Sequence, residues 1–163
     1  MNELPKVLES VAKIRFQDCD PFNHLNNAAY INYMINARED QLISHYNIDI
    51  YKLGKTEGKS WVVGSNQITY LRPAFLMEDV VIDSQLINYS NSTLQVEIRM
   101  WNKDKTELKS VMWSTFVHFN LLKLKPENHS EDFMKLFESV NLPIAVSTFE
   151  ERINTIKAKK ISV

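Results

Sequence analysis

Residues 18–27, DCDPFNHLNN, bring together side chains that can carry acid–base chemistry. The stretch contains two aspartates, the only cysteine of the chain, one histidine and three asparagines, with a single proline among them. Carboxylates and imidazoles are common general acids and bases. An aspartate beside a proline at the end of a strand is, however, usually a turn device. The flanking elements therefore have to decide between a plain polar turn and a reactive site.

A strand is predicted before this stretch and a helix after it. In residues 12–17 apolar and polar side chains alternate, which is the period of a half-buried strand. Residues 26–46 contain no glycine or proline, and apolar side chains recur there at helical spacing. The first half of this helix is apolar nearly all round, which indicates a helix enclosed by other structure.

Four further strands are expected beyond a polar loop that carries Gly54 and Gly58. The connections between these strands are short, so neighbouring strands should pair antiparallel. The predicted strands cover residues 60–71, 80–89, 93–101 and 107–120.

Two short helices complete the predicted order of elements. Ser130 has the position of an N-cap, and Ser147 with Glu150 has the spacing of a capping box. We therefore expect one domain over residues 1–140 and an amphipathic helical extension over residues 141–163. At this length the extension is expected to dock on its own subunit or on a partner rather than on a membrane.

One long helix beside this many strands predicts an α+β fold, because each kind of element buries its apolar face against the other. A sheet of five strands leaves two open edges. Pairing with a second copy of the chain is one way to remove them, so we expect at least a dimer.

Composition excludes several classes of function. A formal net charge of −1 gives no global field that would hold nucleic acid, and three glycines form no glycine-rich loop for a nucleotide. A single cysteine allows no internal disulfide, and His45, His118 and His129 do not have metal-ligand spacing. No apolar run has the length of a membrane span, and the N-terminus has no apolar signal segment, so we expect a cytoplasmic protein.

The longer segment FQDCDPFNHLNNAAYINYMINARED, residues 16–40, resembles the first strand, turn and central helix of hotdog-fold acyl-CoA thioesterases. Its DCDP resembles the branch of 4-hydroxybenzoyl-CoA thioesterase. The pattern D-x-x-G-H-x-N-N of the bacterial long-chain acyl-CoA branch is matched by Asp20, His24, Asn26 and Asn27.

A second segment, residues 68–83 (ITYLRPAFLMEDVVID), resembles a later strand of the same family, its Arg-Pro turn and the start of the next strand. The likeness as a whole covers roughly residues 13–120, with the elements in the family's order.

This resemblance implies a hotdog fold, in which a five-stranded antiparallel sheet wraps around one long central helix and short C-terminal helices follow. It implies a hydrolase of acyl-CoA thioesters, in fatty acid metabolism, that needs no cofactor or metal. The expected partners are the acyl-CoA substrate and further copies of the chain, as a homodimer or a tetramer of dimers, without nucleic acid and without stable membrane insertion. The pocket should lie between the helix N-terminus of one subunit and the sheet of its neighbour.

The resemblance also assigns roles to individual residues. Asp20 is expected to be the catalytic carboxylate, either as nucleophile or as general base. The backbone amide of Asn27 is expected to polarise the thioester carbonyl. With Asn26 as N-cap, the amides of Asn27 and Ala28 would lack intrahelical partners and lie at the positive end of the helix dipole. His24 and Asn26 are expected to contact substrate or orient the loop, and Trp61 to line the acyl channel.

Three neighbours of these residues receive structural expectations. Asn23 stands where the family has glycine, and asparagine is the residue next most able to adopt the positive φ of that glycine, so the turn should persist. Asp18 is expected to bond to nearby backbone, and Cys19 to be inert.

Two other functions stay open at this point. One is hydrolysis of acyl groups carried by acyl carrier protein, which is the same chemistry on a protein-borne substrate. The other is a non-catalytic hotdog domain that binds acyl thioesters or a lipid-like ligand without turnover.

Overall fold

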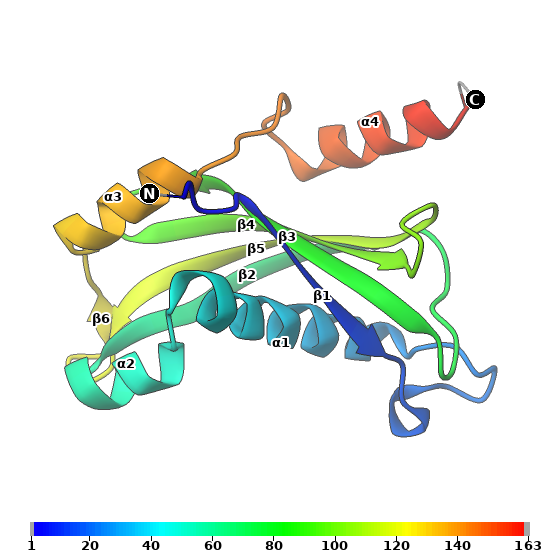
Figure 1. Cartoon of the computed structure of the whole chain (residues 1–163), viewed down its shortest axis with the longest axis horizontal. Helices are drawn as coiled ribbons and strands as arrows, with labels where there is room; N and C mark the ends of the chain where they lie inside the picture. Colours follow the sequence, from blue (N-terminus) through cyan, green and yellow to red (C-terminus); the bar gives the residue numbers. More distant parts are fainter. Residues whose placement is uncertain (1, 162–163) are drawn as a thin grey trace.

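A computed structural model describes residues 2–161 as one curled antiparallel sheet with one long and three shorter α-helices (Figure 1). The strands are β1 (Val7–Lys13), β2 (Lys59–Tyr70), β3 (Asp79–Tyr89), β4 (Thr93–Asn102), β5 (Leu108–Asn120) and β6 (Lys125–Pro126). The α-helices are α1 (Asn27–Tyr46), α2 (Ile50–Glu57), α3 (Glu131–Val140) and α4 (Phe149–Ile161).

The sheet has the strand order β1-β3-β4-β5-β2, and all neighbours pair antiparallel. The two residues of β6 pair with the end of β5. The predicted five-stranded antiparallel sheet is therefore confirmed, with a very short sixth strand added. β1 and β2 are the edge strands, and β2 has a bulge between Val63 and Ser65.

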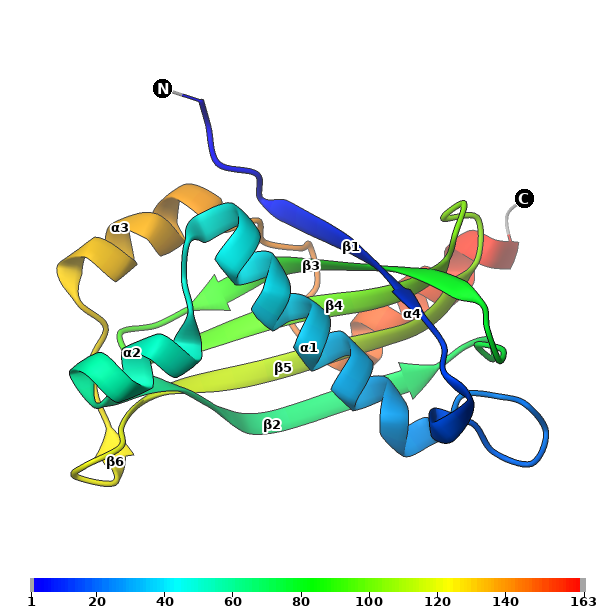
Figure 2. The same cartoon turned by 60° about the horizontal axis from the view of Figure 1, so that its bottom comes forward.

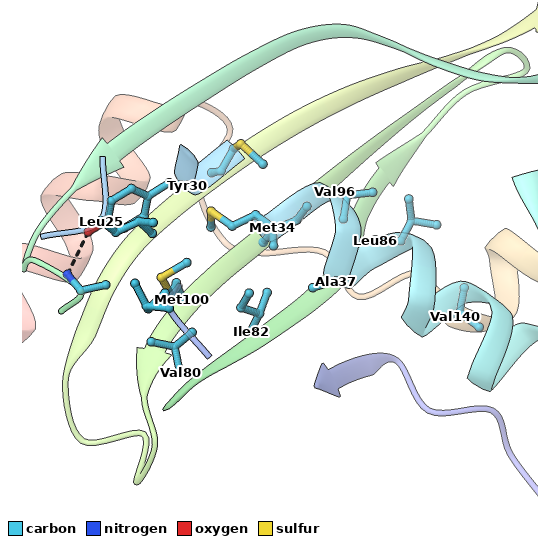
Figure 3. Close-up of a cluster of buried hydrophobic side chains, with 14 of the residues drawn as sticks. Leu25, Tyr30, Met34, Ala37, Val80, Ile82, Leu86, Val96, Met100 and Val140 are labelled. Carbon is cyan, nitrogen blue, oxygen red and sulfur yellow. Dashed lines mark hydrogen bonds between the residues drawn. The ribbon is translucent and has the colours of Figure 1, made fainter. Parts of the chain in front are cut away.

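Helix α1 lies along the concave face of the sheet, as expected for a hotdog fold (Figure 2). Its inward side chains Tyr30 and Met34 are at most 2% exposed and pack against sheet residues such as Ile82 and Met100 (Figure 3). Burying a side chain of this size contributes about 2 kcal/mol. This contact between helix and sheet forms the main core.

The ends of α1 agree with the predicted helix over residues 26–46. Asn26 is the N-cap, and its side-chain oxygen accepts from the amide of Ala28 at 3.1 Å. Asn47 ends the helix in the left-handed region, with a φ of 54°. Asparagine tolerates this conformation better than most residues, which explains the stop without a glycine.

The predicted strand over residues 12–17 is wrong in its position. The observed β1 pairs with β3 from Val7↔Gln85 to Lys13↔Asp79. Because β3 begins at Asp79, residues after Lys13 have no strand to pair with. Residues 16–18 form one turn of 3-10 helix instead, and Phe16 is 77% exposed.

Helix α2 occupies the segment that was expected to be a polar loop. Asp49 caps its start by accepting from the amides of Tyr51 and Lys52, both at 3.0 Å. Gly58 ends the helix with a φ of 67°, a conformation that glycine adopts without steric cost. Asp49 and Gly58 are the sequence signals for this helix. Gly54 lies inside the helix, where glycine is unfavourable, and it made the segment look like a loop.

The C-terminal helices begin close to where they were predicted. Ser130 caps α3 by accepting from the amide of Phe133 at 3.2 Å, as expected. The capping box of α4 lies one residue later than predicted. Thr148 accepts from the amide of Glu151 at 3.2 Å, and the Glu151 carboxylate accepts from the amide of Thr148 at the same distance.

Helix α4 covers part of the sheet face opposite α1 (Figure 1). Arg152 makes a bidentate ion pair with the buried carboxylate of Glu97, at 2.7 and 2.8 Å. The ring of Phe149 lies edge-on to Trp113, and Ile153 is only 6% exposed. None of the described helices combines the length and apolar character required to cross a membrane.

A buried cluster of aromatic and histidine rings fastens the start of α3 to β2. Trp61 donates from its indole nitrogen to Nε2 of His129 at 2.9 Å, and Nδ1 of His129 lies 3.1 Å from the carbonyl oxygen of Ser90. Nε2 is thus the unprotonated acceptor and Nδ1 carries the proton. Burial, together with the neighbouring His118, lowers the pKa of His129 to about 4.

Stability should therefore depend on pH through His129. The folded pKa lies below the ordinary value of 6.5, so the neutral ring stabilises the fold above pH 6.5, and this contribution is lost as the pH falls towards 4. His129→Gln keeps an acceptor for Trp61 and a donor for Ser90 but does not titrate. Between pH 7 and pH 4, urea unfolding should show the wild type losing about 2 kcal/mol more than this variant. Equal pH profiles would contradict the assignment.

Candidate active site

Residues 18–26 form a closed loop that ends at the first turn of α1. The amide of Asn26 donates to the carbonyl oxygen of Asp18 at 2.9 Å, and Cys19 and Leu25 form an isolated bridge. At the tip, the amide of Asp20 donates to the carbonyl oxygen of His24 at 2.8 Å. The loop therefore holds Asp20 a few residues from the helix N-terminus.

The Asp20 side chain is half-buried and bonds to its own loop. Its Oδ1 accepts from the amides of Phe22 at 2.9 Å and His24 at 3.1 Å. No hydrogen bond to Oδ2 is found among residues 2–161. One carboxylate oxygen is thus fixed by the turn, and the other makes no hydrogen bond within the described residues.

Asn23 has a φ of 60°, so the positive φ expected at this position is confirmed. Its carbonyl oxygen accepts from the amide of Leu76 at 2.9 Å, and its amide donates to the carbonyl oxygen of Asp20 at 3.1 Å. The turn expected at this position is therefore present, with asparagine in the left-handed region.

The first turn of α1 offers one amide rather than two. The amide of Ala28, expected only to lack an intrahelical partner, donates to the side chain of the N-cap Asn26. Within the described residues the amide of Asn27 donates to no protein atom. The hydroxyl of Tyr70 donates to the Asn27 carbonyl oxygen at 2.7 Å, which ties this turn to β2.

A second loop, residues 72–78, supports the first. The amide of Leu25 donates to the carbonyl oxygen of Ala74 at 2.8 Å, and His24 and Phe75 form a bridge. The amide of Ala74 in turn donates to the hydroxyl of Tyr30 at 2.9 Å. This loop was expected only as an Arg-Pro turn, and its support of the Asp20 loop is a tertiary feature.

The side chain of Lys109 holds the loop of residues 72–78 in place through its ammonium group. Its side chain is 2% exposed, and its ammonium lies 2.9 Å from both a Glu78 carboxylate oxygen and the carbonyl oxygen of Pro73. A buried ammonium without such partners would be strongly destabilising. No local pattern in the sequence indicates this role, because a lysine in a strand is normally exposed.

Asp18 and Cys19, which precede Asp20 in the loop, make structural contacts. Asp18 accepts from the hydroxyl of Tyr33 at 2.6 Å rather than bonding to backbone as expected. Cys19 donates to the carbonyl oxygen of Arg15 at 3.4 Å. Burial, with help from the neighbouring carboxylates, raises the pKa of the Cys19 thiol, which keeps it protonated and unreactive.

The structure separates the predicted site residues into two groups. Asp20, His24, Asn26 and Asn27 lie together in the loop and first turn described above. The ring of His24 packs edge-on to Phe75, with centroids 5.2 Å apart, and makes no hydrogen bond within the described chain. Trp61 instead lies near the start of β2 in the aromatic cluster, away from this loop.

Trp61 does line a cavity, which lies between the second half of α1, the sheet and α3. The cavity has a volume of about 50 Å³, and its wall is almost entirely apolar. Arg38, which sequence reasoning did not single out, is also part of the wall. Among the described residues no three histidine, cysteine or acidic side chains come together as a metal site.

The backbone at Asn23 leads to a test of the turn. Asn23→Gly should leave the free energy of unfolding within about 0.5 kcal/mol of wild type, because glycine adopts a positive φ without strain. Asn23→Val should destabilise by about 1–2 kcal/mol, because a β-branched side chain is strained there. Thermal unfolding of both variants measures the difference, and equal stability of the two would contradict this role.

Comparison with known proteins gives a consistent picture. Residues 14–137 match the family model described as the thioesterase-like superfamily. The long-chain acyl-CoA thioesterase FadM of Escherichia coli is 33% identical over 79 residues, which is 48% of this chain and 58% of FadM. The matched segment thus spans little more than half the length of that relative.

Solved structures match over longer segments. YbaW from Escherichia coli aligns with a TM-score of 0.69 at 25% identity, over 82% of this chain and 99% of YbaW. DHNA-CoA thioesterase from Staphylococcus aureus aligns with a TM-score of 0.73 at 16% identity, over 94% of this chain and 95% of that one. The family match covers most of the chain and the fold agrees with it, so the chain belongs to the thioesterase-like superfamily.

Proposed function

We propose that this protein hydrolyses acyl-CoA thioesters to a free acid and coenzyme A. One observation carries the proposal: a carboxylate with a free oxygen, that of Asp20, is held by its loop beside a helix N-terminus that has a free amide, that of Asn27. Thioester hydrolysis needs both parts, a nucleophile or base and a donor at the developing oxyanion. Membership of the thioesterase-like superfamily and the partial match to FadM support this chemistry.

The amide of Asn27 would donate to the thioester carbonyl oxygen. The α1 dipole adds partial positive charge at the same point, and a helix of 20 residues with its N-cap in place is a suitable source of it. Preorganised donors of this kind typically contribute about 3 kcal/mol to stabilising the transition state. Asn26 would act indirectly, because its side chain accepts from the Ala28 amide and leaves that of Asn27 to the substrate.

Asp20 would act through Oδ2 in one of two ways. As nucleophile, Oδ2 bonds to the carbonyl carbon and the thiolate of coenzyme A leaves, which gives a mixed anhydride that water then hydrolyses. As general base, Oδ2 takes a proton from a water molecule whose oxygen attacks the same carbon, and the C–S bond then breaks so that the thiolate of coenzyme A leaves. His24 would shape the substrate entrance beside Phe75, and Trp61 would line the far part of the acyl site.

Replacing Asp20 tests the mechanism. Asp20→Asn keeps the Oδ1 acceptor for the amides of Phe22 and His24 but removes the charge. Acyl-CoA hydrolysis, followed as free thiol, should fall by more than about a hundred-fold, because a general base contributes at least that much. Circular dichroism should not change.

The matched control is Asp18→Asn, which keeps an acceptor for Tyr33 and should leave hydrolysis within a few-fold of wild type. Full activity of Asp20→Asn would contradict the mechanism. If wild type hydrolyses acyl groups on acyl carrier protein but not on coenzyme A, thioester hydrolysis is supported and coenzyme A is excluded as the carrier of the substrate. If it binds acyl-CoA and releases no thiol, the protein is a binder.

A homodimer would form through the edge of β2. Residues 62–67 of this strand are exposed one after another, and β2 has a neighbour on one side only. Such an edge offers unpaired backbone groups to a second copy of the chain. The resemblance to the family adds that the neighbour's sheet would complete the pocket at the start of α1. Two such dimers could associate further into a tetramer.

Charge placed on this edge should dissociate the dimer. Ser65→Asp puts a negative charge on the same edge of both copies, and like charges repel across paired strands. Light scattering after size exclusion at micromolar concentration should show a shift from dimer towards monomer. Val11→Asp on the other edge strand, at a residue that is 66% exposed, is the control and should leave the dimer intact. Dissociation by Val11→Asp instead would place the interface on β1.

A further inference from the structure

Arg38 is a buried cation for which the described chain supplies no carboxylate. The residue is 6% exposed, and its one side-chain bond is from Nη1 to the hydroxyl of Ser84 at 3.0 Å. The adjacent Glu39 makes no ion pair with it and accepts from the hydroxyl of Tyr51 at 2.9 and 3.0 Å. A guanidinium has five N–H donors, and charges inside proteins are normally paired.

The surroundings of Arg38 make this unusual. Ser84 is already engaged, because its hydroxyl donates to Gln41 at 2.6 Å. Burial lowers the pKa of Arg38 to about 10, so the side chain stays charged at neutral pH. An uncompensated buried charge destabilises a protein by several kcal/mol. Its presence therefore suggests a partner that arrives from outside the chain.

The cavity described above gives Arg38 access to such a partner. Arg38 belongs to its wall together with Glu39 and apolar residues that include Leu86, Val96 and Val140, and these three are labelled in Figure 3. A single water needs about 10–15 Å³ by the measure that gives this cavity about 50 Å³, so a carboxylate-sized group fits. The apolar wall favours a ligand whose charged group is attached to a hydrocarbon chain.

One stripe of α1 extends from the candidate active site to this cavity. Along α1, Ile31, Ile35 and Leu42 follow Asn27 at helical spacing on one stripe of the helix, and all three are only partly buried. Arg38 lies 11 residues beyond Asn27 on α1, about 16 Å at 1.5 Å per residue. A zigzag hydrocarbon chain of about a dozen carbons has this reach, given a C–C bond of about 1.5 Å.

We propose that Arg38 and this cavity form a subsite for a carboxylate at the end of an aliphatic chain. The chain would be the acyl group of a thioester whose far end carries a second carboxylate, or a free fatty acid. Both have the same chemistry, a carboxylate on a hydrocarbon, and a planar guanidinium can hold it through two parallel hydrogen bonds. The thioester form of this inference rests on the proposed hydrolase function.

Kinetics test the thioester form. The CoA monothioester of dodecanedioic acid and dodecanoyl-CoA have equal chain lengths and differ at the far end only. The ratio of their kcat/KM values should favour the diacid in wild type and fall by about tenfold or more in Arg38→Met, the difference that one charged hydrogen-bonded pair makes. In Arg38→Lys, which keeps the charge, this ratio should fall by less than in Arg38→Met.

Arg38→Met is expected to fold, because replacing a buried charge by an apolar side chain of similar size is often neutral or stabilising. The matched control is Lys157→Met, which removes an exposed cation on α4 and should leave the ratio unchanged. An equal ratio in wild type and Arg38→Met would overturn the thioester form.

Direct binding tests the free-acid form without any hydrolysis. Dodecanoate should bind wild type more tightly than dodecanol does, by titration of tryptophan fluorescence, since Trp61 is in the cavity wall. Arg38→Met should lose this preference and Asp20→Asn should keep it. Loss of the preference in Arg38→Met supports the subsite even if no thioester is hydrolysed, in which case the proposed function alone fails. If neither the kinetic ratio nor the binding preference depends on Arg38, the inference is overturned while hydrolysis stands.

Discussion

Burial of α1 in the concave face of the sheet is the constraint on which the candidate site depends. Tyr30 makes the link, because its ring is 2% exposed in the core while its hydroxyl accepts from the amide of Ala74 in the second loop (Figure 3). The core thereby sets the position of the helix N-terminus and of the loop that braces Asp20. The polar loop carries no apolar core of its own and takes its shape from this contact.

Two buried cations on the inner side of the molecule contrast in how they are satisfied. Lys109 is surrounded by Glu78, Glu107 and a backbone carbonyl, so it stabilises the loop it touches. Among the described residues, Arg38 bonds to one hydroxyl, and it lies in the wall of an apolar cavity. Because an unpaired charge costs more than a paired one, the first arrangement reads as structural and the second as a place for a ligand.

The outer face of the sheet is held by a different set of interactions. Asp83 and Glu97 are buried there and are neutralised by Arg99 and Arg152, so α4 brings one of the cations that this face requires. The extension is thus bound to the sheet by charge as well as by the apolar contact of Ile153. The candidate site lies on the inner face, and the chain's own C-terminal helix covers part of the outer face.

The amino-acid sequence alone determined the elements whose signals are local. The capping asparagine of α1, the alternation of apolar and polar side chains along strands such as β4, and the asparagine at a positive φ are local signals. Each acts within a few residues, and each was predicted. The family pattern around Asp20 likewise lies in one continuous segment.

Tertiary structure decided what depends on distant partners. Residues 12–17 alternate like a strand, yet β3 begins too late for residues after Lys13 to pair with it. The amide of Ala28 donates to the side chain of Asn26, and the rotamer that makes this hydrogen bond cannot be read from the sequence. Lys109 and Arg38 look like ordinary surface cations in the sequence. Tertiary contacts bury both of them. Lys109 lies against the loop of residues 72–78, where Glu78 supplies a carboxylate, whereas Arg38 lies against β3 and bonds to the hydroxyl of Ser84.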